Sequence, residues 1–325
     1  MIPRPRSPLV RILVSLTLLA PALPVAAEPG GPDLGLFSAH GDIGTVSRPG
    51  TVAYDGGTDT YTVGGSGVNM WGAQDAFHYV WKQAGGDIAI AADIAFLGES
   101  PEPHRKACLV IRQSLDADSA YADVAVHGDG LTSLQFREVA GGPTSEVQSR
   151  LSAPRRVRLE KIGGAIYLSV APADGELAPS GCSVMLAFQD PFYIGLGVCA
   201  HNETAFETAT FTRVTLGEPG REVLAVRSSL EFVKIASGDR RSVHHSADVI
   251  EAPNWTRDGA ALIFNSKGRL YRVPVDGSAA PEAIDTGFAT RNNNDHGLSP
   301  DGTLLATSDQ SQDEGRSVIH VLPAS

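Results

Sequence analysis

One short segment of the sequence combines a tryptophan with amide and carboxylate side chains. The stretch SGVNMWGAQDAFHYVW places Asn69, Trp71, Gln74 and Asp75 just before an apolar run. An indole can stack on the apolar face of a sugar ring while neighbouring polar groups bond its hydroxyls. We therefore predict that these four residues contribute to a ligand site. The alternative is that the indole of Trp71 fills a hydrophobic core, which is the interpretation favoured for Trp81.

Two other polar loops follow strand-like runs. The loop HGDG begins at His127, and the loop CAHNE contains His201 and Asn202. Binding residues are often carried on loops that a rigid scaffold positions. We add these three residues to the predicted ligand site. The simpler interpretation, in which the two histidines cap or bridge loops, stays open.

The sequence lacks the motifs of several catalytic classes. It contains no GxSxG elbow, no HExxH, no CxxC and no glycine-rich phosphate loop. The run DADSAYAD offers Asp116, Asp118 and Asp123, but it lacks the glycine and the distal glutamate of a calcium loop. A turn is the preferred interpretation of this run. We predict neither a metal nor a cofactor, and a non-catalytic role is favoured.

The elements expected to position these residues are strands. Residues 35–217 form one short apolar run after another, separated by Gly, Pro, Asp and Ser. In VRLEKI, strand alternation places Val157, Leu159 and Lys161 on one face. This pattern predicts an all-β domain of the sandwich or jelly-roll type. A linker is expected at residues 218–229.

A second region, residues 230–325, contains a repeated unit. The turns TRDG and SPDG end at Gly259 and Gly302, 43 residues apart, and each precedes an apolar strand. Both have the residue order of a type I turn, and a repeat of about 40–45 residues with short strands indicates propeller blades. The sequence shows two such blades. The segment Leu230–Ile235 is interpreted as a strand that closes the ring.

The residues just before the repeated turns are predicted to face a central channel. They are Asn254 and Trp255 in the first repeat and Asp295 and His296 in the second. The alternative, for Asp295 and His296, is that they bond the backbone of the neighbouring turn.

An array of two blades leaves apolar faces uncovered, because repeat arrays need about three units for stability. We therefore expect Leu262, Phe264 and Leu305 to lack part of their packing surface. The propeller is expected to be truncated, and the chain is expected to self-associate through its unpaired blades.

The N-terminus is predicted to be a secretory signal. Arg4, Arg6 and Arg11 precede an apolar run, and small residues lead to a predicted cut after Ala27. Residues 28–34 are a short linker. The prediction is a periplasmic or secreted protein with no transmembrane anchor. The formal net charge of −11 argues against nonspecific nucleic-acid binding.

The chain contains three cysteines, which cannot all pair with one another. Cys108 and Cys199 lie in strand-like runs, so small buried thiols are favoured over a disulfide among Cys108, Cys182 and Cys199.

Longer stretches of the sequence resemble known families. The run FHYVWKQAGGDIAIAADIAF, with ACLVIRQSLDADSAYADVAVHGDG and FYIGLGVCAHN, is similar to concanavalin A-like sandwich modules fused to bacterial propellers. The repeats resemble the TolB-type, WD40-like units of secreted bacterial proteins labelled biopolymer transporters. The resemblance implies a concanavalin A-like jelly roll followed by two blades of an incomplete β-propeller. Laminarinase-like relatives carry Glu-x-Asp-x-x-Glu along one strand, and this sequence does not.

Two functions are compatible with these features. The first is a non-catalytic secreted or periplasmic binding protein, whose sandwich binds glycan or polypeptide and whose repeats form a protein-interaction surface. Its partners would be a glycan or an envelope protein. The second is a carbohydrate-active enzyme of the lyase or hydrolase type, acting at the propeller channel. The absence of a paired-carboxylate motif favours the first.

Overall fold

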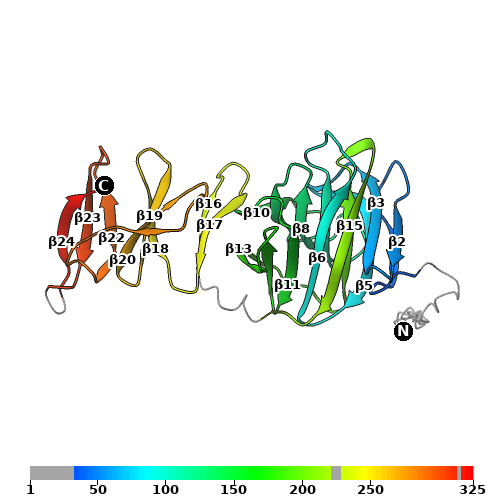
Figure 1. Cartoon of the computed structure of the whole chain (residues 1–325), viewed down its shortest axis with the longest axis horizontal. Helices are drawn as coiled ribbons and strands as arrows, with labels where there is room; N and C mark the ends of the chain where they lie inside the picture. Colours follow the sequence, from blue (N-terminus) through cyan, green and yellow to red (C-terminus); the bar gives the residue numbers. More distant parts are fainter. Residues whose placement is uncertain (1–32, 221–227, 313–315, 325) are drawn as a thin grey trace, which may run out of the picture. The chain divides into compact units, whose positions relative to one another are not determined.

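The computed structural model describes residues 33–220, 228–312 and 316–324. The predicted signal peptide lies outside the described residues. Every regular element in the described part of the chain is a β-strand, as Figure 1 shows, which confirms the all-β prediction. Within these residues, no helix is long and apolar enough to cross a membrane.

The described strands of the first region, together with β16 and β17 from the chain after it, form two sheets. The larger sheet has the strand order β1-β5-β14-β7-β8-β9-β10-β17-β16, with β4 paired to β5. Its strands are β1 (Ala39–Ile43), β4 (Asn69–Trp71), β5 (Gln74–Ala84), β7 (Lys106–Arg112), β8 (Tyr121–His127), β9 (Thr132–Arg137), β10 (Thr144–Gln148), β14 (Phe192–Cys199), β16 (Ser228–Val233) and β17 (Arg240–Ser246). The smaller sheet has the order β13-β12-β11-β6-β15-β3-β2. Its strands are β2 (Thr51–Asp55), β3 (Thr60–Gly67), β6 (Ile88–Leu97), β11 (Arg156–Ile162), β12 (Ala165–Ala171), β13 (Ala178–Met185) and β15 (Asn202–Gly217).

The two sheets share one hydrophobic core. Leu109 and Val124 of the larger sheet belong to the same buried cluster as Leu159 and Phe211 of the smaller one. Val157 also lies in this cluster, so the predicted alternation of VRLEKI is confirmed for Val157 and Leu159. Because successive side chains of a strand point to opposite faces, each strand of the larger sheet presents a second set of residues away from this core.

The C-terminal repeats form two further sheets. A four-stranded sheet contains β18 (Glu251–Trp255), β19 (Ala261–Ser266), β20 (Arg269–Pro274) and β21 (Glu282–Ala283), and a three-stranded sheet contains β22 (Asn292–Leu298), β23 (Leu304–Asp309) and β24 (Val318–Pro323). The two predicted turns are built alike. The amide of Gly259 donates to the carbonyl of Thr256, and the amide of Gly302 donates to the carbonyl of Ser299, both at 2.9 Å. Both glycines have positive φ, 68° and 75°, which other residues rarely adopt.

Two expectations about the repeats are wrong. The predicted ring-closing strand, β16, pairs instead with β17, which lies parallel to β10. Leu230 and Val243 of this hairpin pack with Leu262 and Phe264 in one buried cluster. Leu305 is also fully buried. The three side chains expected to be short of packing surface are therefore covered.

The cysteines follow the preferred interpretation. Cys108, Cys182 and Cys199 are all buried, free thiols. Burial raises the pKa of Cys182 to about 12 and that of Cys199 to about 11, so neither is a reactive thiolate near neutral pH.

Candidate ligand pocket on the larger sheet

The candidate site lies on the face of the larger sheet that points away from the shared core. On β8, Ala122, Val124 and Val126 face the core, so Asp123 and His127 occupy the opposite face. We call this the outer face of the larger sheet. Members from the central strands are Lys106, Cys108, Val110, Arg112, Tyr121, Asp123, Ala125, His127, Ser133, Gln135, Arg137, Thr144 and Glu146.

The short strand β4 and the turn after it are fixed to this outer face by hydrogen bonds. The hydroxyl of Tyr121 donates to the carbonyl of Met70 at 3.2 Å. The carbonyl of Gly72 accepts from Arg137 Nε at 3.1 Å and from the Thr144 hydroxyl at 2.9 Å. Residues of β8, β9 and β10 therefore hold the aromatic loop predicted from the sequence in one place.

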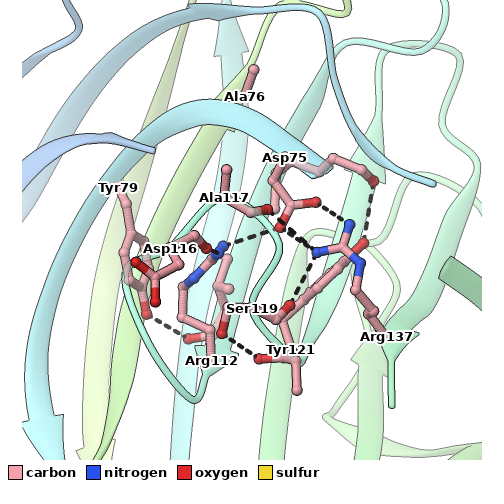
Figure 2. Close-up of polar contacts among 12 residues, drawn as sticks. Asp75, Ala76, Tyr79, Arg112, Asp116, Ala117, Ser119, Tyr121 and Arg137 are labelled. Atoms are coloured by element: carbon pink, nitrogen blue, oxygen red, sulfur yellow. Dashed lines mark hydrogen bonds and ion pairs between the residues drawn. The ribbon is translucent and has the colours of Figure 1, made fainter. Parts of the chain in front are cut away.

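One end of the outer face is closed by a buried ion cluster (Figure 2). Arg137 contacts Asp75 through both oxygens, at 2.7 and 2.9 Å, and Arg112 contacts it at 3.3 Å. All three side chains are fully buried. The guanidinium groups also donate to backbone carbonyls, including that of Asp116 at 2.6 Å and that of Ser119 at 3.0 Å. This cluster anchors the loop before β8 to the sheet.

The structure gives Asp75 a different position from the one predicted. Its oxygens are occupied by two guanidinium groups, and it does not line the pocket described below. The turn interpretation of DADSAYAD is correct at Asp116, whose carbonyl accepts from the amide of Ser119. It is wrong for Asp123, which belongs to β8 and is fully buried.

The other end of the outer face is open and forms a pocket of about 250 Å³. It is lined by Asn69, Trp71, His104, Lys106, His127, Leu131, Gln135, Glu146 and His201. Four of the predicted ligand residues, Asn69, Trp71, His127 and His201, are thus brought together from three separate segments. Gln74 and Asn202 are exposed and lie outside the lining.

Other hollows in the described residues are larger, at about 320, 380, 400 and 510 Å³. None of these four is lined by a tryptophan; their aromatic side chains are Tyr167, Phe136 and His245. The smaller pocket is preferred because it combines an indole with several buried polar groups, which is the composition expected of a specific ligand site.

Lysine 106 links the strand floor to the aromatic loop. Its ammonium donates to Asn69 Oδ1 at 2.8 Å and to the carbonyl of Met70 at 3.0 Å. The same nitrogen lies 5.7 Å from the centroid of the Trp71 ring. Two of its three protons are therefore used in positioning the loop, and the half-buried indole of Trp71 is held at the pocket.

The pocket histidines are oriented by their Nδ1 atoms. His127 Nδ1 lies 3.0 Å from the carbonyl of Leu131, and His201 Nδ1 lies 3.1 Å from Glu102 Oε1. Since a carbonyl only accepts, we assign the Nδ1 proton to His127, which leaves its Nε2 as an acceptor. Burial, with a smaller contribution from Lys106, lowers the pKa of His127 to about 4 and also lowers that of His201. Both rings are neutral near pH 7.

The exposed ring of His104 lies near both, with centroid separations of 6.1 Å to His127 and 5.2 Å to His201. Within the described ranges, no group of three His, Cys, Asp or Glu side chains is arranged to hold a metal ion.

Sequence reasoning missed five lining residues. His104 and Leu131 lie on loops, whereas Lys106, Gln135 and Glu146 lie on strands. Among the strand residues, Gln135 had a detectable signal, because it is a polar residue between the buried apolar Leu134 and Phe136. The covering loop turns this polar face of the strands into a pocket.

The predicted channel residues do not meet in one place. Asn254 joins the two repeats by donating to the carbonyl of His296 at 3.2 Å. Trp255 is 51% exposed and lies near Phe232, with centroids 6.2 Å apart. Asp295 is exposed. Neither ring nitrogen of His296 has a hydrogen-bond partner among the described residues, so the backbone-bonding alternative is not met there.

Comparisons with known proteins give partial matches. No known protein family profile matches the chain. An uncharacterized protein of Agrobacterium fabrum is 44% identical over 118 residues, which are 36% of this chain and 39% of that protein. The chain therefore matches less than half the length of this relative.

Two solved structures are also similar in part. A putative TolB from Agrobacterium tumefaciens is 48% identical, over 30% of this chain and 35% of that one, with a TM-score of 0.29. A functionally unknown protein from Saccharomyces cerevisiae is 14% identical, over 54% of this chain and 95% of that one, with a TM-score of 0.43.

Proposed function

We propose that this chain is a non-catalytic binding protein of the bacterial envelope, which binds a saccharide in the pocket on the outer face of the larger sheet. One observation carries the proposal. Asn69, Trp71, His127 and His201 were selected as ligand residues from separate loops, and they line the same pocket. An aromatic ring beside neutral hydrogen-bonding groups is suited to a sugar, which has apolar ring faces and hydroxyl edges.

The charge of the lining supports a ligand without strong acidity. Lys106 and Glu146 are one cation and one anion, and the two histidines oriented through Nδ1 are neutral near pH 7. A sulfated or phosphorylated ligand would find one lysine, already bonded to Asn69 and to the carbonyl of Met70.

The carboxylates of the lining favour binding over catalysis. Glycoside hydrolysis by most families needs two carboxyl groups that flank the scissile bond. Among the described residues that line the pocket, Glu146 is the only carboxylate. The alternative of a carbohydrate-active enzyme therefore has less support here.

Three finer features belong to the same proposal. The two core-sharing sheets are a concanavalin A-like jelly roll, and the C-terminal sheets are two blades of a TolB-type propeller that offers a protein-interaction surface. The chain is exported through a signal peptide cut after Ala27. The strand order supports the first of these features, the repeated turns support the second, and the arginines before the N-terminal apolar run support the third.

A glycan-array screen of the mature chain, followed by calorimetry with the best saccharide, tests the function. Trp71→Ala should weaken binding about tenfold, since stacking on an indole contributes about 1–2 kcal/mol. The melting temperature should change little because the ring is half-buried. Trp255→Ala is the matched control, as its exposed indole lies outside the pocket. Unchanged affinity in Trp71→Ala, or binding of peptides alone, would exclude a saccharide site here.

A further inference from the structure

The polar groups of the pocket are unevenly divided between donors and acceptors. The side chain of Gln135 is 2% exposed and its Nε2 lies 3.5 Å from His127 Nε2. Because His127 carries its proton on Nδ1, its Nε2 accepts, and the amide nitrogen of Gln135 must face it. The other end of the amide, Oε1, is buried and has no hydrogen-bond partner among the described residues. Gln135 therefore has an acceptor, Oε1, to which no described group donates a hydrogen bond.

Glu146 places a second acceptor beside the first. Gln135 is the cross-strand partner of Glu146, so both side chains lie on the outer face of adjacent strands. Glu146 Oε1 accepts from Gln148 Nε2 at 2.6 Å, and the described residues donate no hydrogen bond to its Oε2. Directly opposed residues on neighbouring strands have Cβ atoms about 5 Å apart. One ligand group can therefore contact both acceptors.

Several donors of the pocket are already engaged. Lys106 uses two protons on Asn69 and Met70, and His127 and His201 use their Nδ1 sites on Leu131 and Glu102. The free Nε2 atom of His201 is a further acceptor under the same assignment. A hydroxyl of a ligand would bring one donor and two acceptor lone pairs into this group of acceptors. An ammonium brings three donors and no acceptor, and it carries the charge that a carboxylate favours.

The remaining charges allow a cation to enter. A second carboxyl, that of Asp123, lies behind Gln135 as its partner on β8, and neither oxygen has a hydrogen-bond partner in the described part of the chain. Burial raises the pKa of Asp123 and keeps its carboxyl protonated near neutral pH, so the carboxylate that accompanies Lys106 in the lining is that of Glu146. The indole of Trp71 adds an aromatic face, to which cations are attracted.

We infer that the pocket is specific for a saccharide that carries a protonated amine, with the ammonium bound by Gln135 Oε1 and Glu146 and the sugar ring stacked on Trp71. This inference rests on the proposed function, and it names the substrate class for that site.

The test is calorimetric titration of the full mature chain with two matched ligands at about pH 6. One is a glucosamine oligomer, whose amines are protonated, and the other is its N-acetylated counterpart. The wild type should bind the amine form at least tenfold more tightly. Glu146→Gln should reduce this preference to about twofold or less while the N-acetylated ligand binds as before. Glu138→Gln, an exposed control on the following turn, should keep the full preference.

The other outcomes separate the two proposals. Equal affinity for both oligomers, lost in Trp71→Ala, would overturn the amine inference and leave saccharide binding intact. Binding of neither oligomer, with a lysine-containing peptide bound instead, would overturn both. If Glu146→Gln does not fold, as judged from its melting curve, Gln135→Met removes the other acceptor and must reduce the same preference.

Discussion

Replacing Asp123 by Asn should change how the stability of the protein depends on pH. Asp123 lies on β8, fully buried, and no described side chain or amide donates a hydrogen bond to its carboxyl oxygens. Burial, with a contribution from the nearby charge of Asp75 and against the effect of Lys106, raises its pKa from 3.8 to about 8. The folded protein therefore keeps a proton that the unfolded chain has lost at neutral pH.

The sign and the size of the change in unfolding free energy with pH follow from this difference in pKa. Between about pH 4 and pH 8 the unfolded state ionises Asp123 and the folded state does not, so the free energy of unfolding falls as pH rises. The slope is about 1.4 kcal/mol per pH unit. Asparagine has the same shape and no proton to lose. Relative to wild type, Asp123→Asn should therefore gain about 2.7 kcal/mol between pH 5 and pH 7.

Urea unfolding of both proteins at these two pH values, followed by tryptophan fluorescence, measures the change. The amide of the variant has no hydrogen-bond partner and therefore lowers the unfolding free energy. This loss is the same at both pH values, so it cancels when they are compared. Asp174→Asn is the control, since Asp174 is exposed. If the stability difference between wild type and Asp123→Asn is the same at both pH values, the carboxyl is not held protonated in the fold.

Three further substitutions test the packing. Asp75→Asn should cost about 3–5 kcal/mol in unfolding free energy, because two buried guanidinium groups lose their carboxylate; a loss below about 1 kcal/mol would show that the backbone carbonyls suffice. Phe264→Ala should cost about 3–5 kcal/mol in urea unfolding, since the ring is 2% exposed in a cluster with Leu230 and Val243; a near-neutral result would mean that the hairpin does not cover it. Gly302→Ala should lower the unfolding free energy by about 1 kcal/mol, since φ is 75° there; an unchanged midpoint would contradict a left-handed turn residue.

The sequence by itself determined the local features. The turns ending at Gly259 and Gly302 were predictable because a type I turn depends on four consecutive residues. The faces of Val157 and Leu159 were predictable because alternation in a strand has a fixed period of two. The polar aromatic loop around Trp71 was recognisable as a binding candidate from its composition alone. Each of these inferences needs information from only a few neighbouring positions.

The tertiary structure decided which of these residues act together. Asp75 stood beside Trp71 in the sequence, yet the strand order places it against Arg112 and Arg137, out of the pocket. Conversely, Gln135 and Glu146 were not predicted as ligand residues, and cross-strand pairing makes them neighbours on the pocket floor. The pairing register of the strands decides which side chains share the pocket. A shift of one residue would turn both side chains into the core, and only the burial of apolar partners across the whole sheet excludes that shift.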